Sequence, residues 1–243
     1  DELIYLCGKK NVHCEIFGKN TGNLPVAGEY SVEIVSKAIA AFVGITYEIS
    51  PPQGNIQLPI RPPVLCAGCP HRASFYACKV ALKGKKAVYS GDIGCYTLGN
   101  AKPLDMVDTC LCMGAGITIS QGLHEIEKDT ANLAFIGDST FFASGITGVI
   151  NALYNNHNIT IIILDNSTTA MTGHQPHPGT GRNLMKSPTD SVDIEAILRG
   201  CGVKSIATIN PLEFENAVEA VKVANEFNGV SVVIFKYPCI ALF

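Results

Sequence analysis

Residues 132–145 read NLAFIGDSTFFASG and decide the fold of this chain. The apolar run Leu133–Ile136 has the composition of a buried β-strand, and it ends on Gly137-Asp138-Ser139. The segment that follows is apolar and compatible with a helix. A carboxylate therefore stands where a strand turns into a helix. A single Asp at such a turn is usually a helix cap, so the neighbouring segments must decide whether Asp138 has another role.

The same strand-then-helix pattern recurs along the rest of the chain. The last helix is expected to begin at Pro211, with Asn210 as its N-cap and Glu213 completing a capping box. Continuous apolar strands that alternate with helices are typical of a parallel sheet with helices on both faces, so we predict an α/β fold of this kind. The expected strands are Ala87–Tyr89, Leu133–Ile136, Ile159–Leu164, Val203–Ala207 and Val230–Phe235, and the expected helices are Ala73–Leu82, Gly116–Glu127, Phe141–Asn155, Ile194–Arg199 and Pro211–Phe227.

Residues 1–60 differ in pattern from the rest of the chain. They contain one expected helix, which begins near Ser31 with Glu33 in its first turn. Five prolines then lie within residues 51–63, and proline fixes φ and lacks an amide hydrogen, so an extended linker is expected there. We predict a boundary near the end of this stretch: residues 1–60 form a linker segment from a preceding domain, and residues 61–243 form the main domain. Because the chain does not begin with Met, we expect it to be a piece of a longer polypeptide.

The composition indicates a globular protein with a sizeable core. Hydrophobic residues make up 47% of the 243 residues and charged residues 16%, and the net charge is −3. This charge offers no electrostatic reason to expect a nucleic acid partner, and no apolar stretch approaches the roughly 20 residues that span a bilayer. Ten cysteines are many for a chain that is not a short, disulfide-rich secreted scaffold. We therefore expect reduced thiols in the cytoplasm, some of which hold metal.

Two polar side chains follow neighbouring strands of the predicted sheet. Asp138 comes directly after one strand, and Asp165-Asn166 ends the next strand along the chain. Ligands of open parallel sheets bind at the carboxyl ends of the strands. A carboxylate and a carboxamide there offer hard oxygen atoms that suit Mg²⁺ together with a phosphate, and Gly137 permits close approach of the backbone. The alternative is a turn Asp and a capping Asn.

Several longer motifs occur in one order along the chain. The tripeptide GDS at 137–139 is followed, after a spacer, by Asn166, and the strings LCAGCPHR, SGDIGCYTLG, DTCLCMGAG, IGDSTFF and DNSTTAMTGHQPHPGTG surround these positions. Together they resemble the thiamine diphosphate-binding part of the 2-oxoacid:ferredoxin oxidoreductases, and within that family the large (alpha) subunit of the indolepyruvate type. Ser139 stands where the family usually has a glycine. The resemblance runs from about Arg61 to the end, with a weaker match over residues 16–36.

The resemblance implies a binding site for thiamine diphosphate and Mg²⁺. The side chains of Asp138 and Asn166 and the backbone carbonyl of Thr168 are implied as the Mg²⁺ ligands. His174 and His177 lie in the loop after these residues, and a substrate or lid role is expected for them, with an ordinary surface loop as the alternative. For His174 a catalytic role is also considered. The residues implied to contact the cofactor are Ile93, Gly94, Cys95, Tyr96, Gly114, Gly137, Asp138, Ser139, Thr140, Asn166, Thr168, Thr172 and Gly173.

Four cysteines form a second implied site. By itself, the pair Cys66-x-x-Cys69 is consistent with zinc, with a redox couple or with no function. The resemblance matches this pair, together with Cys95 and Cys239, to the ligands of a [4Fe–4S] cluster, which takes four thiolates. Cys95 is also implied to contact the cofactor, so the cluster would lie close to it. Zinc stays open as the alternative metal, and His71 is expected either to cover the cluster or to cap a helix.

The resemblance also implies a reaction and its partners. The reaction is oxidative decarboxylation of aryl 2-oxoacids, indolepyruvate above all, to acyl-CoA and CO₂, with ferredoxin as electron acceptor. In such enzymes the glutamate that activates the cofactor lies on a separate pyrimidine-binding domain, so we expect it on another domain or chain. The implied partners are that pyrimidine-binding domain or subunit, a small gamma-type subunit, ferredoxin, coenzyme A and the 2-oxoacid.

Two other functions fit parts of the sequence. A non-oxidative thiamine diphosphate decarboxylase or carboligase would use the same Mg²⁺ motif, but it does not need four cysteines that act as cluster ligands. A zinc-bearing binding module would use the cysteines but needs neither Asp138 nor Asn166. In the preferred interpretation, the chain alone binds the diphosphate weakly and turns over no oxoacid.

Overall fold

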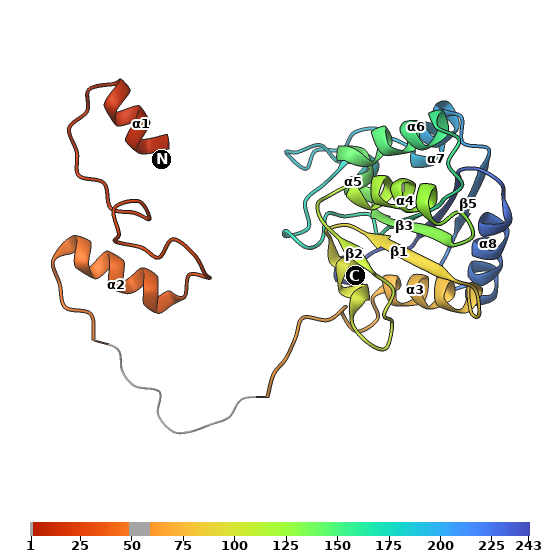
Figure 1. Ribbon diagram of the computed structural model, residues 1–243, viewed down its shortest axis with the longest axis horizontal. Helices are drawn as coiled ribbons and strands as arrows, with labels where there is room; N and C mark the ends of the chain where they lie inside the picture. The colour runs from red at the N-terminus through yellow and green to blue at the C-terminus, as the bar shows by residue number, and fades with distance from the viewer. Residues whose placement is uncertain (1, 49–58) are drawn as a thin grey trace. The chain divides into compact units, whose positions relative to one another are not determined.

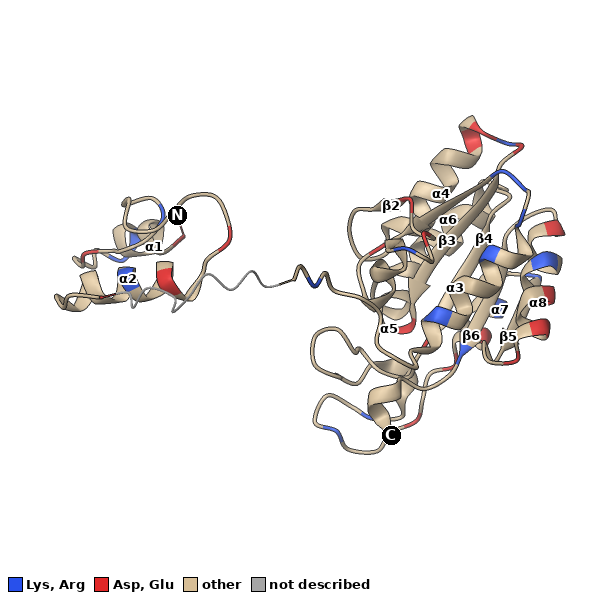
Figure 2. Cartoon of the chain, turned by 90° about the horizontal axis from the view of Figure 1, so that it is seen from below, with Lys and Arg blue, Asp and Glu red and all other residues tan. Residues whose placement is uncertain are grey.

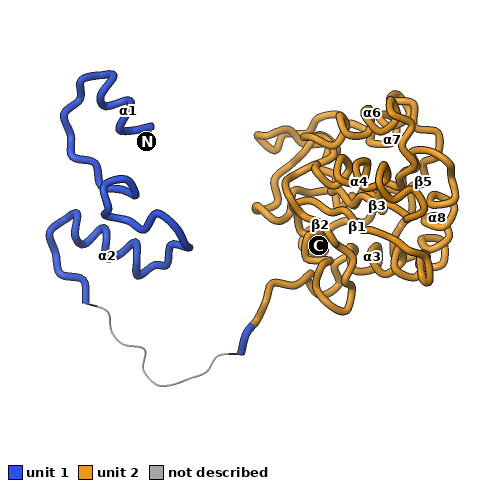
Figure 3. Tube along the Cα trace, viewed as in Figure 1, with its two compact units in different colours: residues 1–60 blue, residues 61–243 orange. Residues whose placement is uncertain are grey.

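The computed structural model describes residues 2–48 and 59–243, and the chain forms two compact units, Asp1–Ile60 and Arg61–Phe243 (Figure 3). Most of the expected proline-rich linker falls on residues 49–58 and lies outside the described residues. The interpretation of the first unit as a segment from a preceding domain stays a prediction.

The first unit contains two helices, α1 (Glu2–Lys9) and α2 (Val32–Val43). The helix expected near Ser31 is confirmed: Ser31 is the N-cap of α2, and its hydroxyl accepts a hydrogen bond from the Ile34 amide at 3.2 Å. In the described part of this unit, α1 has no buried residue and α2 buries only Ala40. The unit therefore has little apolar core of its own.

The second unit is built on a six-stranded parallel sheet in the order β2-β1-β3-β4-β6-β5, which confirms the predicted α/β fold (Figure 1). β2 was not expected, because a strand of two residues is too short to show a pattern. The strands are β1 (Ala87–Gly91), β2 (Thr109–Cys110), β3 (Ala131–Gly137), β4 (Thr160–Asp165), β5 (Ser205–Ile209) and β6 (Ser231–Lys236).

Helices cover both faces of the sheet. On one side lie α3 (Pro70–Ala81) and α8 (Phe214–Glu226), and on the other lie α4 (Ala115–Ile126), α6 (Ile146–Tyr154) and α7 (Ile194–Cys201) (Figure 1). Successive side chains of a strand point to opposite faces, so each central strand contributes to both cores. The first core takes Leu133, Phe135, Ile162, Leu164, Val233 and Phe235 from the strands, and the second takes Ala134, Ile136, Ile161, Ile163, Val232 and Ile234.

The helix after β3 begins at Asp138 rather than at the predicted Phe141. It runs through α5 (Asp138–Thr140), a π-helical turn η2 (Phe141–Gly145) and α6 without interruption. Gly137, with φ −80° and ψ 159°, is the extended residue that precedes it. Asp138 is therefore the first residue of a helix, and the turn from strand to helix is immediate.

The predicted start of the last helix was wrong. α8 begins at Phe214, and Glu213 is its N-cap, instead of Asn210. The side-chain oxygen of Asn210 accepts a hydrogen bond from the Leu212 amide at 3.0 Å, and its carbonyl accepts one from the Glu213 amide at 3.0 Å. These bonds close a turn over the residues that would have formed the first helical turn, since Asn side chains favour such local bonds.

A close contact between α4 and β1 depends on Gly116. A Cβ atom at this position would lie 3.1 Å from the Ser90 carbonyl oxygen and 3.2 Å from the Gly91 carbonyl carbon, which are backbone atoms of β1. Backbone cannot move aside as a flexible side chain can. Gly122, on the same helix, has no atom within 4 Å of the equivalent position.

We predict opposite effects for alanine at these two glycines. Gly116→Ala should lower the free energy of unfolding by about 1–3 kcal/mol, because the added methyl group overpacks the contact with β1. Gly122→Ala is the matched control and should raise it by about 0.5–1 kcal/mol, because alanine is the better helix former. Urea denaturation followed by circular dichroism measures both. Equal effects of the two substitutions would show that α4 is not held this closely against the sheet.

Candidate functional site

A pocket at the carboxyl edge of β1, β3 and β4 gathers most of the residues that the sequence singled out. It is lined by all of the implied cofactor-contacting residues except Gly114 and Gly173. This convergence follows from topology, because the carboxyl ends of parallel strands meet at one edge of the sheet. The lining residues are His71, Ile93, Gly94, Cys95, Tyr96, Met113, Gly137, Asp138, Ser139, Thr140, Leu164, Asn166, Thr168, Thr169, Ala170, Met171 and Thr172.

Asp138 is held in a fixed orientation by its neighbours. Its side chain is buried, and one carboxylate oxygen accepts a hydrogen bond from the Ser139 amide at 2.7 Å. The other oxygen accepts one from the Ser167 amide at 2.9 Å and lies 3.0 Å from His177 Nε2. His177 is itself buried, so this pair is shielded from water. The sequence placed His177 in the loop but did not predict that it would contact Asp138.

A second carboxylate lies beside Asp138. Asp165, the last residue of β4, is buried, and burial and the charge of Asp138 raise the pKa of its carboxyl group. Lys236 Nζ lies 3.7 Å from one of its oxygens. Two carboxyl groups this close repel one another when both are ionised, which is the arrangement that a bound cation relieves. Sequence reasoning named Asp165 only as the end of a strand.

Asn166 faces a neutral histidine. Its amide nitrogen lies 3.4 Å from His71 Nε2, and both side chains are buried. Burial lowers the pKa of His71 to about 4, so the ring is neutral at pH 7 and can accept a hydrogen bond from the amide. His71 lies in the first turn of α3. The amide oxygen of Asn166 accepts a hydrogen bond from the Thr168 amide at 3.4 Å and has a second lone pair that a cation could use.

Gly137 allows an aromatic ring to lie against the strand end. A Cβ atom at Gly137 would lie 2.6 Å from Cε1 of Tyr96, so a larger residue would displace the ring. Tyr96 is buried and belongs to the short helix η1 (Cys95–Asn100) after β1. Its hydroxyl lies 3.2 Å from Thr140 Oγ1, so the turns after β1 and after β3 are joined by one contact.

Asp92 organises this part of the site, although sequence reasoning missed it. It is fully buried and accepts hydrogen bonds from the Tyr96 hydroxyl and, at 2.7 Å, from the Gly114 amide. Burial raises its pKa to about 6, against the lowering effect of these two donors. Gly114 therefore contacts Asp92 and does not line the pocket. The string SGDIGCY could have indicated Asp92, because this residue directly follows β1 and so lies at a strand end.

The loop after β4 folds into a hairpin beside the pocket. Thr169 and Gln175 exchange backbone hydrogen bonds of 3.0 and 3.2 Å, and the Thr169 hydroxyl donates to the Ser139 hydroxyl at 2.8 Å. Thr168, Thr169 and Thr172 line the pocket. Gly173 and His174 lie at the far end of the hairpin with positive φ and are exposed, so neither lines the pocket. The catalytic or lid role of His174 stays a prediction.

The four singled-out cysteines lie near one another. Cys66 and Cys69 precede and cap α3, Cys95 begins η1, and Cys239 follows β6. Burial raises the pKa of the Cys69 thiol, and the nearby Cys66, Cys239 and Cys95 raise it further. The Cys239 amide donates to the Asn166 carbonyl at 2.9 Å, so the C-terminal segment runs along the pocket. All ten cysteines lie in the described part of the chain, and all are free thiols.

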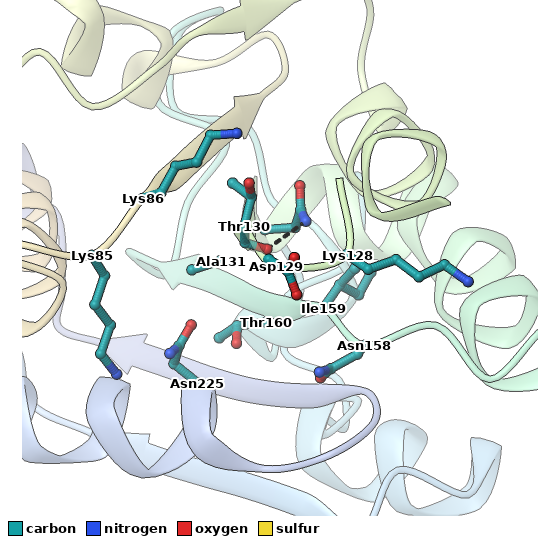
Figure 4. Close-up of a pocket in the computed structure, with 11 residues that line it drawn as sticks. Lys85, Lys86, Lys128, Asp129, Thr130, Ala131, Asn158, Ile159, Thr160 and Asn225 are labelled. Carbon is teal, nitrogen blue, oxygen red and sulfur yellow. Dashed lines mark hydrogen bonds between the residues drawn. The ribbon is translucent and has the colours of Figure 1, made fainter. Parts of the chain in front are cut away.

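A second hollow lies at the opposite, amino edge of the sheet (Figure 4). Its wall includes Lys85, Lys86 and Lys128, but no residue that the sequence singled out. Lys86 pairs with Glu127 at 2.7 Å, and Lys85 lies 3.9 Å from Glu226. Acidic and basic residues also stand side by side on α8 (Figure 2). These are charges paired on a solvated surface, and they do not form a strongly basic site.

Comparison with known families identifies the fold of the site. Residues 92–235 match the family described as thiamine pyrophosphate enzyme, C-terminal TPP binding domain. The match covers more than half of the chain and extends from Asp92 to Phe235 in β6. Every residue that lines the pocket except His71 lies within it. The chain belongs to this family of thiamine pyrophosphate enzymes.

Several proteins are similar to this thiamine pyrophosphate enzyme chain. Indolepyruvate oxidoreductase subunit IorA of Archaeoglobus fulgidus is 45% identical over 236 residues, which are 94% of this chain and 38% of that protein. IorA of Methanothermobacter thermautotrophicus is 41% identical over 246 residues, 98% of this chain and 39% of that protein. The chain thus spans well under half the length of these relatives. The 2-oxoglutarate synthase subunit KorB of A. fulgidus is 28% identical over 71% of this chain and 68% of that protein.

A solved structure has the same fold. The 2-oxoglutarate:ferredoxin oxidoreductase from Magnetococcus marinus, with 2-oxoglutarate, coenzyme A and succinyl-CoA bound, superposes with a TM-score of 0.63 at 19% identity. The superposition covers 74% of this chain and 65% of that one. Among the described residues, none belongs to a helix that is long and apolar enough to cross a membrane.

The buried Asp92 predicts a pH-dependent stability. Its pKa is raised from 3.8 to about 6, so the folded state holds a proton that the unfolded state releases between these values. Its contribution to stability is therefore largest below pH 4 and is lost as the pH rises through 6. The free energy of unfolding of the wild type minus that of Asp92→Asn should fall by up to about 3 kcal/mol between pH 4 and pH 7.

Urea denaturation across this pH range measures the difference, with Asp129→Asn as the control because Asp129 is exposed. The control shows how far replacing an exposed carboxylate by an amide affects stability by itself. The opposite result would be a difference in the free energy of unfolding, wild type minus Asp92→Asn, that grows with pH. It would show that the Tyr96 hydroxyl and the Gly114 amide stabilise an ionised carboxylate.

Proposed function

We propose that this chain binds thiamine diphosphate and Mg²⁺ in the carboxyl-edge pocket, as part of a larger 2-oxoacid:ferredoxin oxidoreductase. The observation that carries the proposal is the convergence of Asp138 and Asn166, from two neighbouring strand ends, on one pocket lined by the turn after β1. The family match supports the cofactor, and the IorA and KorB relatives support the class of enzyme.

The donor set fits a magnesium ion. Mg²⁺ prefers oxygen ligands and is usually bound by one or two carboxylates together with phosphate oxygens. Asp138 would supply a carboxylate oxygen, Asn166 its amide oxygen and Thr168 its backbone carbonyl. The neighbouring Asp165 adds a second buried carboxyl group, whose ionised form a cation would stabilise. The alternative of a simple turn Asp does not account for two buried carboxyl groups side by side.

The start of the helix after β3 fits a diphosphate group. The first amides of a helix lack partners within the helix and carry a partial positive charge, so they attract anionic oxygen. Here that helix runs over residues 138–154, and its first turn, Asp138–Thr140, lines the pocket. Gly137 has no side chain, so the backbone here can approach a bound diphosphate closely. The hydroxyls of Ser139 and Thr140 lie next to Gly137 and also line the pocket. The Ser139 hydroxyl that replaces the usual glycine is held by Thr169.

The rest of the pocket positions the cofactor and excludes water. Tyr96, fixed by Asp92, and the apolar side chains of Ile93, Met113 and Met171 form a wall around the polar groups. When bound, thiamine diphosphate supplies the nucleophilic carbon that attacks 2-oxoacids, so the chain has to orient the cofactor and shield it. Ile93, Met113 and Met171 are 43–50% exposed. This apolar rim supports a partner, the pyrimidine-binding domain or subunit, over the pocket.

Cys66, Cys69, Cys95 and Cys239 are proposed to hold a [4Fe–4S] cluster next to the pocket. Cys66, Cys95 and Cys239 are all close enough to Cys69 to raise the pKa of its thiol, so the four thiols converge on one place. Four thiolates suit a [4Fe–4S] cluster, and zinc stays the alternative metal. Because Cys95 also lines the pocket, electrons could pass from the cofactor site to the cluster over a short distance.

The whole reaction is the remaining part of the proposal. We propose oxidative decarboxylation of an aryl 2-oxoacid such as indolepyruvate, with coenzyme A and ferredoxin. The names of the IorA relatives support an oxidoreductase that acts on indolepyruvate. Residues 61–243 would form the cofactor-binding domain and residues 1–60 a segment that leads from a preceding domain. The small gamma-type subunit and the cytoplasmic location stay predictions.

Asp138→Ala tests the cofactor site. The substitution removes a carboxylate at the first turn of the helix, outside both cores, so the fold should persist while Mg²⁺-dependent binding is lost. We expect the affinity for thiamine diphosphate to fall by about 100-fold or more, since even residues behind a metal ligand contribute about 10–100-fold. Calorimetry with thiamine diphosphate and Mg²⁺ measures it, with Asp129→Ala at the amino edge as the control. Unchanged affinity in Asp138→Ala would overturn the assignment of this pocket.

Cys239→Ser tests the cluster separately. In chain purified without oxygen, this substitution should lower the iron content and the melting temperature together, because metal binding and folding are coupled. Cys201→Ser, at a half-buried thiol on α7, is the matched control and should keep its iron. Iron at the wild-type level in Cys239→Ser would exclude Cys239 as a ligand. Zinc in place of iron in the wild type would instead favour the zinc-bearing alternative.

A further inference from the structure

A cluster of metal-ligating side chains lies at the amino edge of the sheet, at the end opposite the carboxyl-edge pocket. His124 and Glu125 belong to the last turn of α4. His157 lies in the connection between α6 and β4, where its amide donates to the Ala152 carbonyl at 3.0 Å. Two segments that are well separated in the chain, with all of β3 and α6 between them, therefore meet here. None of the three residues lines the carboxyl-edge pocket.

The geometry suits one small cation. Glu125 Oε1 lies 3.2 Å from His157 Nδ1 and 3.9 Å from His124 Nδ1. One ligand atom from each residue falls in a group whose members all lie within 4.8 Å of one another. The two imidazole rings are nearly perpendicular, at 86°, with centroids 5.7 Å apart, so they do not stack on each other. In a tetrahedral zinc site with bonds of about 2.0–2.1 Å, neighbouring ligand atoms lie about 3.3 Å apart.

His157 is buried and His124 is partly buried, and each has a buried ring nitrogen with no hydrogen-bond partner. The side chains of His124 and His157 are only 12% and 9% exposed. Nδ1 of each ring is buried and makes no hydrogen bond, although the Glu125 carboxylate is close to both. Buried polar atoms in folded proteins nearly always have a partner, so two such atoms close to one carboxylate need an explanation.

The nearest charges leave one oxygen of Glu125 beside the two rings. Lys128 Nζ lies 4.0 Å from Glu125 Oε2. The other oxygen, Oε1, is the one that lies 3.2 and 3.9 Å from the ring nitrogens. A neutral imidazole keeps a lone pair on one ring nitrogen, and this is the form that binds a metal.

We propose that His124, Glu125 and His157 bind one divalent transition-metal ion, such as Zn²⁺ or Ni²⁺. Two imidazoles and one carboxylate suit these borderline metals, whereas Mg²⁺ and Ca²⁺ require mainly oxygen ligands. The Glu125 side chain is 55% exposed, so the fourth position of the metal opens to water. The ion ties the end of α4 to the entrance of β4 and satisfies both unpaired ring nitrogens. This site is separate from the proposed thiamine diphosphate site and does not depend on it.

Nickel uptake by the full chain tests the proposal, because Ni²⁺ favours imidazole ligands over the thiols that would compete for zinc. Isothermal titration calorimetry with NiCl₂ is done in the presence of a phosphine reductant. The wild type should bind one more equivalent of nickel per chain than His124→Gln or His157→Gln. His13→Gln, at an exposed histidine of the first unit, is the matched control and should keep the wild-type stoichiometry. Nickel should also raise the melting temperature of the wild type and of His13→Gln, but not of His157→Gln.

Glu125→Gln keeps the test decisive if a buried histidine cannot be replaced without unfolding. Glu125 is largely exposed, so this variant should fold as the wild type does while it takes up nickel at least tenfold more weakly. Equal stoichiometry and equal affinity in the wild type, Glu125→Gln and the folded histidine variants would overturn the proposal. That result would assign the nickel to the cysteines or to the carboxyl-edge pocket and would leave the proposed function unaffected.

Discussion

The pairing of β3 with β4 is the contact on which the site depends. In their parallel register Gly137 lies opposite Leu164, so the two strands end at the same level and the residues that follow come together. Asp138 then lies beside Asp165 and Asn166, and its carboxylate accepts a hydrogen bond from the Ser167 amide. A shift of one residue in this register would turn every side chain of β3 to the other face of the sheet and separate these groups. The two apolar cores hold the register, since both faces of both strands are buried.

The second consequence of sheet pairing concerns the C-terminal segment. β6 runs parallel to β4, and the pairing continues past the strand ends, where the Tyr237 amide donates to the Asp165 carbonyl and the Cys239 amide to the Asn166 carbonyl. The last residues of the chain are thus held along the same edge as the pocket. Cys239 is brought near Cys66 and Cys69 in this way, although it lies at the opposite end of the second unit's sequence.

Buried polar groups give the site its stiffness. Asp92 joins the turn after β1 to Gly114 at the start of α4, and Tyr96 joins the same turn to Thr140. His177 closes the loop after β4 onto Asp138. Each of these bonds connects segments that are distant in sequence, and each is shielded from water, where a lost bond costs more than it does at the surface. A site built in this way can present fixed oxygen atoms and amides to a ligand without reorganising.

Local patterns in the sequence were sufficient to predict the alternation of strands and helices, the parallel sheet and the strand-end position of Asp138 and Asn166. These features follow from runs of apolar residues and from the rule that parallel strands end at one edge. The start of α8 was predicted wrongly, because the Asn210 side chain closes a turn where a helix cap was expected. The string SGDIGCY places Asp92 at a strand end, but the contacts of Asp92 with Gly114, of His177 with Asp138 and of His124 with His157 had no local signal in the sequence. Side chains that are far apart in the chain meet only when helices pack on the sheet, so tertiary structure alone decided which polar residues became partners.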